Sequence, residues 1–199
     1  MTTTGNWNTI TLEQLVSEKR RIFPGQKVSM ALKLAASLLQ LKTSQWLRTA
    51  WTNQAICFFH KSPQTVDVEQ PLIPQTFSNP NPEHGDSESE KRPKPMFLEL
   101  GILLLEIWNQ ETFENWANER HQIANITDIM RAGLADCWYE DTFPTMTIRY
   151  GKVVRTCLAF AFEYDQGLPS WDDMDLRISV CAKIIGPLRE ECGSFPSLQ

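Results

Sequence analysis

Three side chains of the sequence could serve acid–base or nucleophilic chemistry: Glu106, His121 and Asp67. A carboxylate or an imidazole acts as a general acid or base when it lies within reach of the reacting proton. The histidines, His60, His84 and His121, have no nucleophile-elbow or active-site cysteine motif around them. An enzyme of unrecognised type, such as a hydrolase, would therefore require the fold to gather two of these three groups in one pocket. For Glu106, we expect a helix-face carboxylate paired with an arginine rather than a catalytic group.

Neither the acidic nor the cysteine residues follow a metal-binding pattern. The spacing of Asp172, Asp173 and Asp175 is similar to the start of an EF-hand loop, but its Gly and its closing Glu are absent. We expect these carboxylates to stabilise a helix N-terminus instead. The five cysteines are scattered and include no CxxC: Cys57, Cys137, Cys157, Cys181 and Cys192. They predict a reducing, cytoplasmic environment, with no metal and no cofactor.

The composition favours one globular domain over residues 1–199. Hydrophobic residues make up 42% of the 199 residues, which is enough for a sizeable core. The net charge is -5 and the pI is about 5.3, so nucleic acid and anionic membranes are not expected partners. The polar start MTTTGNWNT lacks the features of a signal peptide. The apolar runs are shorter than the roughly 20 residues of a membrane span, so none is expected.

The pattern of apolar residues predicts a mainly helical fold. Residues 98–110, LELGILLLEIWNQ, are apolar almost throughout and predict a buried helix from about 97 to 109. A few short strands are expected near 55–74, where AICFF begins. Residues 78–95 contain no aliphatic or aromatic side chain and predict a flexible internal loop. Further helices are expected from Thr11, over 28–39, 111–119, 127–138 and 150–162, and from Asp172 onward with a kink at Pro187.

Five segments resemble, in order, the C-terminal lobe of a protein kinase. They are TLEQLV, KVSMALKLAASLLQLK, AICFF, LGILLLEIW and VVRTCLAF, within residues 10–190. This resemblance implies a helical bundle with the fold of that lobe, and a chain that starts after the kinase hinge. It also implies that the buried helix at 97–109 is the axis of the bundle.

Four segments resemble a fungal kinase-like domain of unknown function, of the kind that accompanies HeLo-type prion-inhibition-and-propagation domains. They read LAASLLQLKTSQWL at 34–47, LGILLLEI at 100–107, RTCL at 155–158 and PLRE at 187–190. Thr156 departs from the pattern, which has Arg at this place. The resemblance implies a role in fungal self/non-self recognition or cell-death signalling, with a HeLo-type or other effector domain as the partner.

The kinase resemblance lacks the residues that phosphoryl transfer needs. Ala50 and Ala55 occupy the positions of the catalytic base and of the metal-binding Asn, and no Phe-Gly follows Asp67. Neither alanine can take a proton or hold Mg²⁺. We therefore expect a non-catalytic, pseudokinase-like interaction module that binds another protein domain or a second copy of itself.

The expected docking surface is the face that an upper kinase lobe would cover. Its candidate partner-binding residues are Leu12, Leu15, Trp46 and Trp51. Exposed apolar patches on monomers generally serve binding, and tryptophans are frequent anchors. In the alternative, the first ten residues, which include Trp7 and Ile10, fold back and cover this face.

Overall fold

The structure is a computed structural model that describes residues 8–18, 20–41, 52–60, 66–68, 70–72, 92–123, 125–165 and 167–195. Trp46, Trp51 and residues 78–91 of the expected internal loop lie outside the described residues. The described part is mainly helical, with one small antiparallel sheet, as the sequence predicts. The likeness to a kinase lobe stays a prediction.

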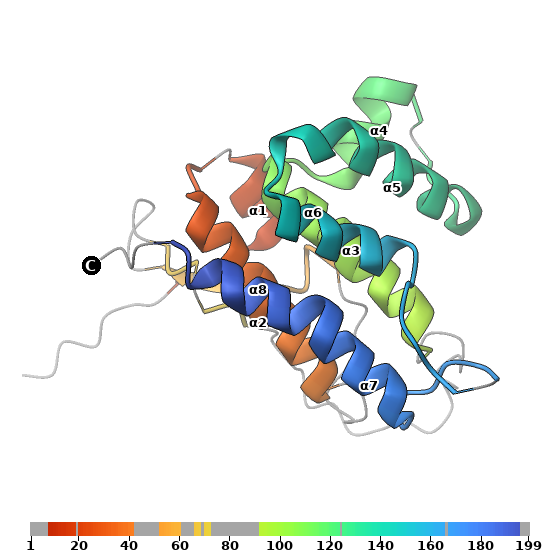
Figure 1. The fold of residues 1–199 in the computed structure, drawn as a ribbon. Helices are drawn as coiled ribbons and strands as arrows, with labels where there is room; N and C mark the ends of the chain where they lie inside the picture. Colours follow the sequence, from red (N-terminus) through yellow and green to blue (C-terminus); the bar gives the residue numbers. More distant parts are fainter. Residues whose placement is uncertain are drawn as a thin grey trace, which may run out of the picture.

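The helices form a bundle around one central helix (Figure 1). In chain order the elements are β1 (Asn8–Thr11), α1 (Leu12–Ser17), α2 (Pro24–Leu41), β2 (Cys57–His60), α3 (Pro93–Asn109), α4 (Phe113–His121), α5 (Asp128–Thr142), a 3₁₀ turn (Phe143–Thr145), α6 (Ile148–Leu158), α7 (Met174–Val180), a π-helical turn (Cys181–Ile185) and α8 (Gly186–Cys192). Figure 1 shows α6 crossing α3, with α2, α7 and α8 on one side of the bundle and α4 and α5 on the other.

The sheet joins the start of the chain to the segment before the central helix. β1 pairs antiparallel with β2, so that Asn8 faces His60 and Thr11 faces Cys57. On its other side β2 forms single bridges, from Cys57 to Leu72 and from His60 to Val66. These contacts confirm short strands near 55–74. The sequence reasoning missed β1, because four residues with one buried side chain give no readable alternation.

A capping box fixes the start of α1, as expected from the sequence. The Thr11 hydroxyl accepts a hydrogen bond from the Gln14 backbone N–H at 3.1 Å, and the Gln14 side chain accepts one from the Thr11 backbone N–H at 3.0 Å. The two bonds satisfy two of the helix's free donors. The Leu12 backbone N–H also donates to the Ile56 carbonyl at 2.8 Å, which ties α1 to the strand region.

Helix α3 is the axis of the bundle, as the sequence predicts. Every residue from Leu100 to Ile107 is buried, and α2, α4, α5 and α6 all contact α3. Gly101 permits the close approach of α6, because a Cβ atom built there would lie 2.6 Å from Leu158 Cδ2. The Tyr150 hydroxyl of α6 donates to the Leu104 carbonyl of α3 at 2.9 Å, inside the core.

Helix α3 begins at Pro93, four residues before the expected Phe97, so the expected loop over 78–95 extends too far. The two prolines at its start, Pro93 and Pro95, suggested loop. The first turn of a helix tolerates proline, since its N–H groups have no partner within the helix.

The last two expected helices also end differently. Helix α6 stops at Leu158 rather than at about 162, because Phe160 adopts a left-handed conformation with φ of 48°. The Phe160 and Ala161 backbone N–H groups bond back to the Cys157 and Thr156 carbonyls at 3.1 and 3.0 Å, which is a Schellman ending. Near Pro187, the expected kink takes the form of the π-helical turn, in which the Gly186 N–H bonds to the Cys181 carbonyl.

Replacing Leu104 by Asp should abolish folding. Leu104 is fully buried in α3, and an unpaired carboxylate there costs several kcal/mol, against a typical domain stability of about 5–15 kcal/mol. The matched control is Ile148→Asp, since Ile148 is 70% exposed at the N-terminus of α6, where an acidic residue is favourable. Circular-dichroism melts measure both. A Leu104→Asp protein that melts within a few degrees of the parent would disprove the central position of α3.

Candidate functional site

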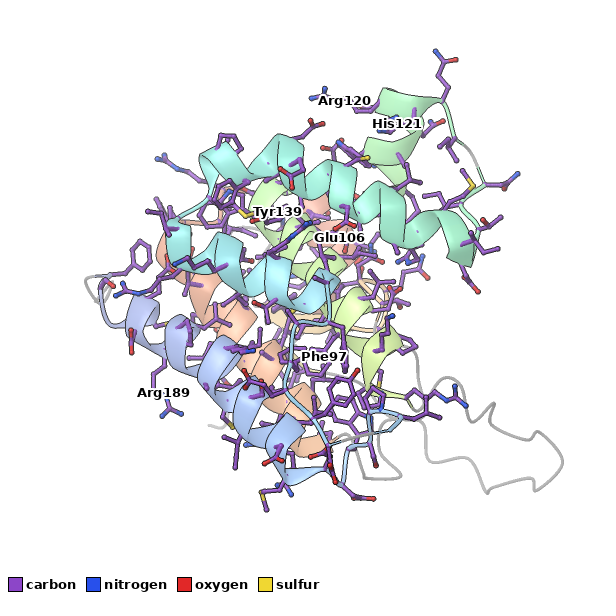
Figure 2. All side chains as sticks on the ribbon, turned by 45° about the vertical axis from the view of Figure 1, so that its right-hand side comes forward. Phe97, Glu106, Arg120, His121, Tyr139 and Arg189 are labelled. Atoms are coloured by element: carbon purple, nitrogen blue, oxygen red, sulfur yellow. The ribbon has the colours of Figure 1, made fainter. Side chains whose placement is uncertain are left out.

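The most unusual polar group of the described residues is the Glu106 carboxyl group, inside the bundle (Figure 2). Glu106 is 2% exposed, although it sits on the apolar axis helix α3. Its Oε1 accepts hydrogen bonds from the Asn53 side-chain amide at 2.8 Å and from the Phe113 backbone N–H at 2.9 Å. Its Oε2 is buried and has no hydrogen-bond partner. One carboxyl group therefore joins three parts of the fold.

Each partner of Glu106 is positioned by its own local structure. Asn53 lies in the turn before β2, where its carbonyl accepts a hydrogen bond from the Glu13 N–H of α1 at 3.1 Å. Helix α3 ends at Gln110, in a left-handed conformation with φ of 54°, and the chain turns directly into α4. This turn brings the free N–H of Phe113, the first residue of α4, back onto Glu106.

Burial makes the Glu106 carboxyl group much less acidic than usual. Loss of solvent raises its pKa to about 8, although the hydrogen bonds from Phe113 and Asn53 oppose the rise. The nearby Glu114 carboxylate adds a smaller upward effect. At neutral pH the group is thus mainly a neutral acid.

The expected pairing of Glu106 with an arginine is wrong. Arg131 of α5 instead binds Glu99 in a bidentate geometry with two contacts of 2.7 Å. Arg131 also contacts Glu114 at 3.4 Å and lies over the Phe113 ring at 5.0 Å. Glu99 lies seven residues, about two helical turns, before Glu106 along α3. Arg131 is 32 positions from Glu99 in the chain, so the sequence alone could not assign the pair.

The three candidate acid–base residues lie on separate parts of the described fold. His121 is exposed at the end of α4, where its ring packs edge-on against Trp116 at 5.0 Å. Figure 2 shows His121 and its neighbour Arg120 at the edge of the molecule, away from Glu106. Asp67 is exposed beyond β2, and its backbone N–H donates to the Phe59 carbonyl at 3.0 Å. The structure therefore brings no two of these groups into one site.

The predicted docking residues have two outcomes. Leu12 and Leu15 are 0% exposed, because both belong to the core under α1, so we do not assign them to an exposed surface. Ile10 of β1 is buried as well, whereas Trp7, the other residue of the alternative in which the start of the chain covers this face, lies outside the described residues. The positions of Trp46 and Trp51 lie outside the described residues.

The acidic cluster near α7 serves the helix start, as expected. Asp173 is the N-cap residue, and its Oδ1 accepts hydrogen bonds from the Asp175 and Leu176 backbone N–H groups at 2.8 and 3.2 Å. A further bond from the Asp165 N–H at 2.7 Å is the main cause of the lowered pKa of Asp173. Among the described residues, no three His, Cys, Asp or Glu side chains gather in a way that could hold a metal ion.

The sequence reasoning missed a group of exposed apolar side chains near α7. Leu168, Met174 and Ile178 are 78%, 61% and 59% exposed, and Tyr164 is 40% exposed. A signal for them exists in MDLRISV, where Met174 and Ile178 are four residues apart, whereas Leu176 and Val180 form the buried side. Helix α7 therefore carries apolar side chains on its exposed side as well as on its buried side.

The profile of one protein family matches residues 3–195, which is nearly the whole chain. The family is described as a domain of unknown function, DUF7580. The chain belongs to this family. No curated protein and no solved structure is detectably similar to it. Within the described residues of this DUF7580 domain, no helix is long and apolar enough to cross a membrane.

Glu106 should make the stability of the DUF7580 domain fall as the pH rises. The pKa of Glu106 is about 8 in the folded chain and near 4.5 in the unfolded chain, so folding favours the protonated form. This contribution is fully present below about pH 4.5 and is lost as the pH rises through about 8. Glu106→Gln keeps the shape and cannot ionise, so its unfolding free energy should exceed that of the parent at pH 9, on the order of a few kcal/mol.

Urea denaturation from pH 5 to 9 measures this difference. Glu140→Gln is the control, since Glu140 is exposed on α5 and its replacement should leave the pH profile of the parent unchanged. If Glu106→Gln and the parent lose stability in parallel between pH 6 and 9, Glu106 is not the group responsible.

Proposed function

We propose that this chain is a non-catalytic protein-interaction module. The observation that carries the proposal is the group of exposed apolar side chains around α7, in a chain with a well-filled core. Isolated apolar side chains are common on protein surfaces, but several together usually mark a binding surface. The docking partner is another protein domain.

The arrangement of the polar groups supports this proposal over the enzyme alternative. A general acid or base must reach the substrate, and Glu106 is 2% exposed. His121 and Asp67 are accessible but lie on elements separate from Glu106. The hydrogen bonds of Glu106 with Asn53 and Phe113 give the carboxyl group a structural role, because they connect α3 to two other segments of the fold.

The resemblance to domains that accompany HeLo-type proteins suggests the biological setting. In this proposal the module works in fungal self/non-self recognition or cell-death signalling, and the partner is a HeLo-type or other effector domain. The kinase-like pattern supports a helical lobe that cannot catalyse phosphoryl transfer, since Ala50 and Ala55 replace the catalytic base and the metal ligand.

The direct test is reconstitution of a complex. The tagged chain is used to capture proteins from the source cells, and each candidate is then purified and titrated against the chain by calorimetry. The proposal predicts a saturable one-to-one complex with a dissociation constant of about micromolar or tighter. A chain that binds no purified candidate but converts a substrate, with loss of turnover in Glu106→Gln or His121→Ala, would support the enzyme alternative.

Addition of ATP and Mg²⁺ should leave the melting temperature unchanged. A ligand at 100 times its dissociation constant stabilises a fold by about 2.7 kcal/mol, which a thermal melt detects. The comparison uses ATP with and without Mg²⁺ at millimolar concentration, with Mg²⁺ alone as the control. A clear Mg²⁺-dependent upward shift would contradict the non-catalytic, kinase-derived interpretation.

A further inference from the structure

The exposed apolar side chains around α7 belong to one region of the fold. The segment 161–165 runs alongside α7 and the π-helical turn, held by three contacts. The Asp165 N–H donates to Asp173 Oδ2 at 2.7 Å, the Glu163 N–H donates to Ser179 Oγ at 3.0 Å, and Lys183 Nζ donates to the Ala161 carbonyl at 3.0 Å. Tyr164 is therefore carried beside the helix. In Figure 1, α7 and this segment lie at one edge of the molecule, away from α4 and α5.

The loop that carries Leu168 is closed and anchored. Its two ends meet in the bond between Asp165 and Asp173, which holds Leu168 near the N-terminal end of α7. Trp171, in the same loop, is 7% exposed and its ring lies 5.6 Å from that of Phe97 in α3. Leu168 itself stays 78% exposed. The fold thus buries one apolar side chain of this loop and presents another to solvent.

Helix α7 presents its apolar side between charged residues. With 3.6 residues per turn, Met174 and Ile178 lie on one side of the helix, opposite Leu176 and Val180, which are buried. Asp175 and Arg177 flank this exposed side. Asp172 and Asp175 are exposed, and within the described part of the chain they form no ion pair.

Most of the net charge of the chain is concentrated here. Residues 163–183 contain five carboxylates, one arginine and one lysine, a net charge of -3, in a chain that carries -5 overall. Glu163 is partly neutralised by Lys183 at 3.0 Å. We name this surface the acidic α7 face. It comprises Tyr164, Leu168, Met174 and Ile178, with Asp165, Asp172 and Asp175 beside them.

We propose that the acidic α7 face docks a basic amphipathic helix of a partner protein. The apolar side chains of such a helix cover Leu168, Met174 and Ile178, and its Lys or Arg residues face Asp172 and Asp175. Methionine side chains adapt to different apolar partners, and opposite charges at the rim speed and orient association. This inference rests on the proposed interaction function and names the class of partner.

The charge argues against the other occupants. A second copy of this chain would bring its own Asp165, Asp172 and Asp175 against those of the first, and like charges across an interface oppose association. An anionic membrane or a nucleic acid would be repelled in the same way. A basic amphipathic helix matches both the apolar side chains and the carboxylates.

The probe is a synthetic helix of about 18 residues, long enough to be stable, with Leu on one side and Lys on the other. A peptide with Glu in place of Lys is the control. The proposal predicts that the Leu/Lys peptide binds the intact chain, more weakly as salt increases, and that the Leu/Glu peptide does not. Met174→Ser/Ile178→Ser should weaken binding about tenfold or more, as expected for the loss of central anchors.

Matched variants separate this face from general attraction to an acidic protein. Ile129→Ser/Ile148→Ser also removes two exposed isoleucines, which are 92% and 70% exposed on α5 and α6, and should bind as the parent does. Asp175→Asn should weaken binding and its salt dependence, whereas Asp128→Asn, also in the first turn of a helix, should not. If the Met174→Ser/Ile178→Ser variant does not fold, the comparison of Asp175→Asn with Asp128→Asn still tests the proposal.

Three results would overturn the proposal. In the first, the Leu/Lys peptide binds the parent and the Met174→Ser/Ile178→Ser variant equally well. In the second, the Leu/Glu peptide binds the parent as tightly as the Leu/Lys peptide does. In the third, sedimentation shows that the parent is a dimer and that Ile178→Ser dissociates it. If a natural partner binds the Met174→Ser/Ile178→Ser variant and the parent with equal affinity, the acidic α7 face is not the binding surface, but the proposed interaction function is not contradicted. If no complex can be reconstituted with any purified candidate, the proposed interaction function itself is contradicted.

Discussion

The burial of α3 from Leu100 to Ile107 is the constraint on which the rest of the structure depends. A helix that is apolar on all sides must be covered on all sides, because its side chains gain free energy only when removed from water. Helices α2, α4, α5 and α6 supply that cover. Gly101 lets α6 approach, and the Tyr150 hydroxyl satisfies the Leu104 carbonyl across the same contact. Glu106 is the fully buried carboxyl group of this helix, and it connects the turn at Asn53 to the start of α4.

This arrangement separates the framework from the proposed binding surface. Helix α7 is not among the elements that pack extensively on α3; it continues instead into the π-helical turn, which contacts α2 and α6. Its exposed side can therefore carry Met174, Ile178 and Asp175 without disturbing the core. The loop before it is held to the framework by Trp171 against Phe97. A rigid bundle that presents a short apolar and acidic surface is what an interaction module needs.

The sequence predicted the parts that follow local rules. The capping box at Thr11, the N-cap at Thr127 and the buried axis around Leu104 all depend on patterns within a few residues. Contacts between distant segments could not be predicted in this way. The hydrogen bond between Asn53 and Glu106 joins residues 53 positions apart. Leu12 and Leu15 are buried in the hydrophobic core, although their sequence neighbourhood suggested an exposed surface. The acidic α7 face was missed because Asp172, Asp173 and Asp175 were interpreted only as residues that stabilise a helix N-terminus. The apolar residues beside them were not considered together with these carboxylates.

The burial of α3 is tested most directly by hydrogen exchange of the backbone amides, followed by mass spectrometry. Amides in a central helix exchange only through global unfolding, whereas amides at a surface exchange through local opening. The account predicts that peptides from 98–109 exchange slowest of all and that their rates follow the free energy of global unfolding in urea. Peptides from 174–180 should exchange earlier. Exchange of 98–109 as fast as that of 174–180, under conditions where the chain is folded, would contradict the central position of α3.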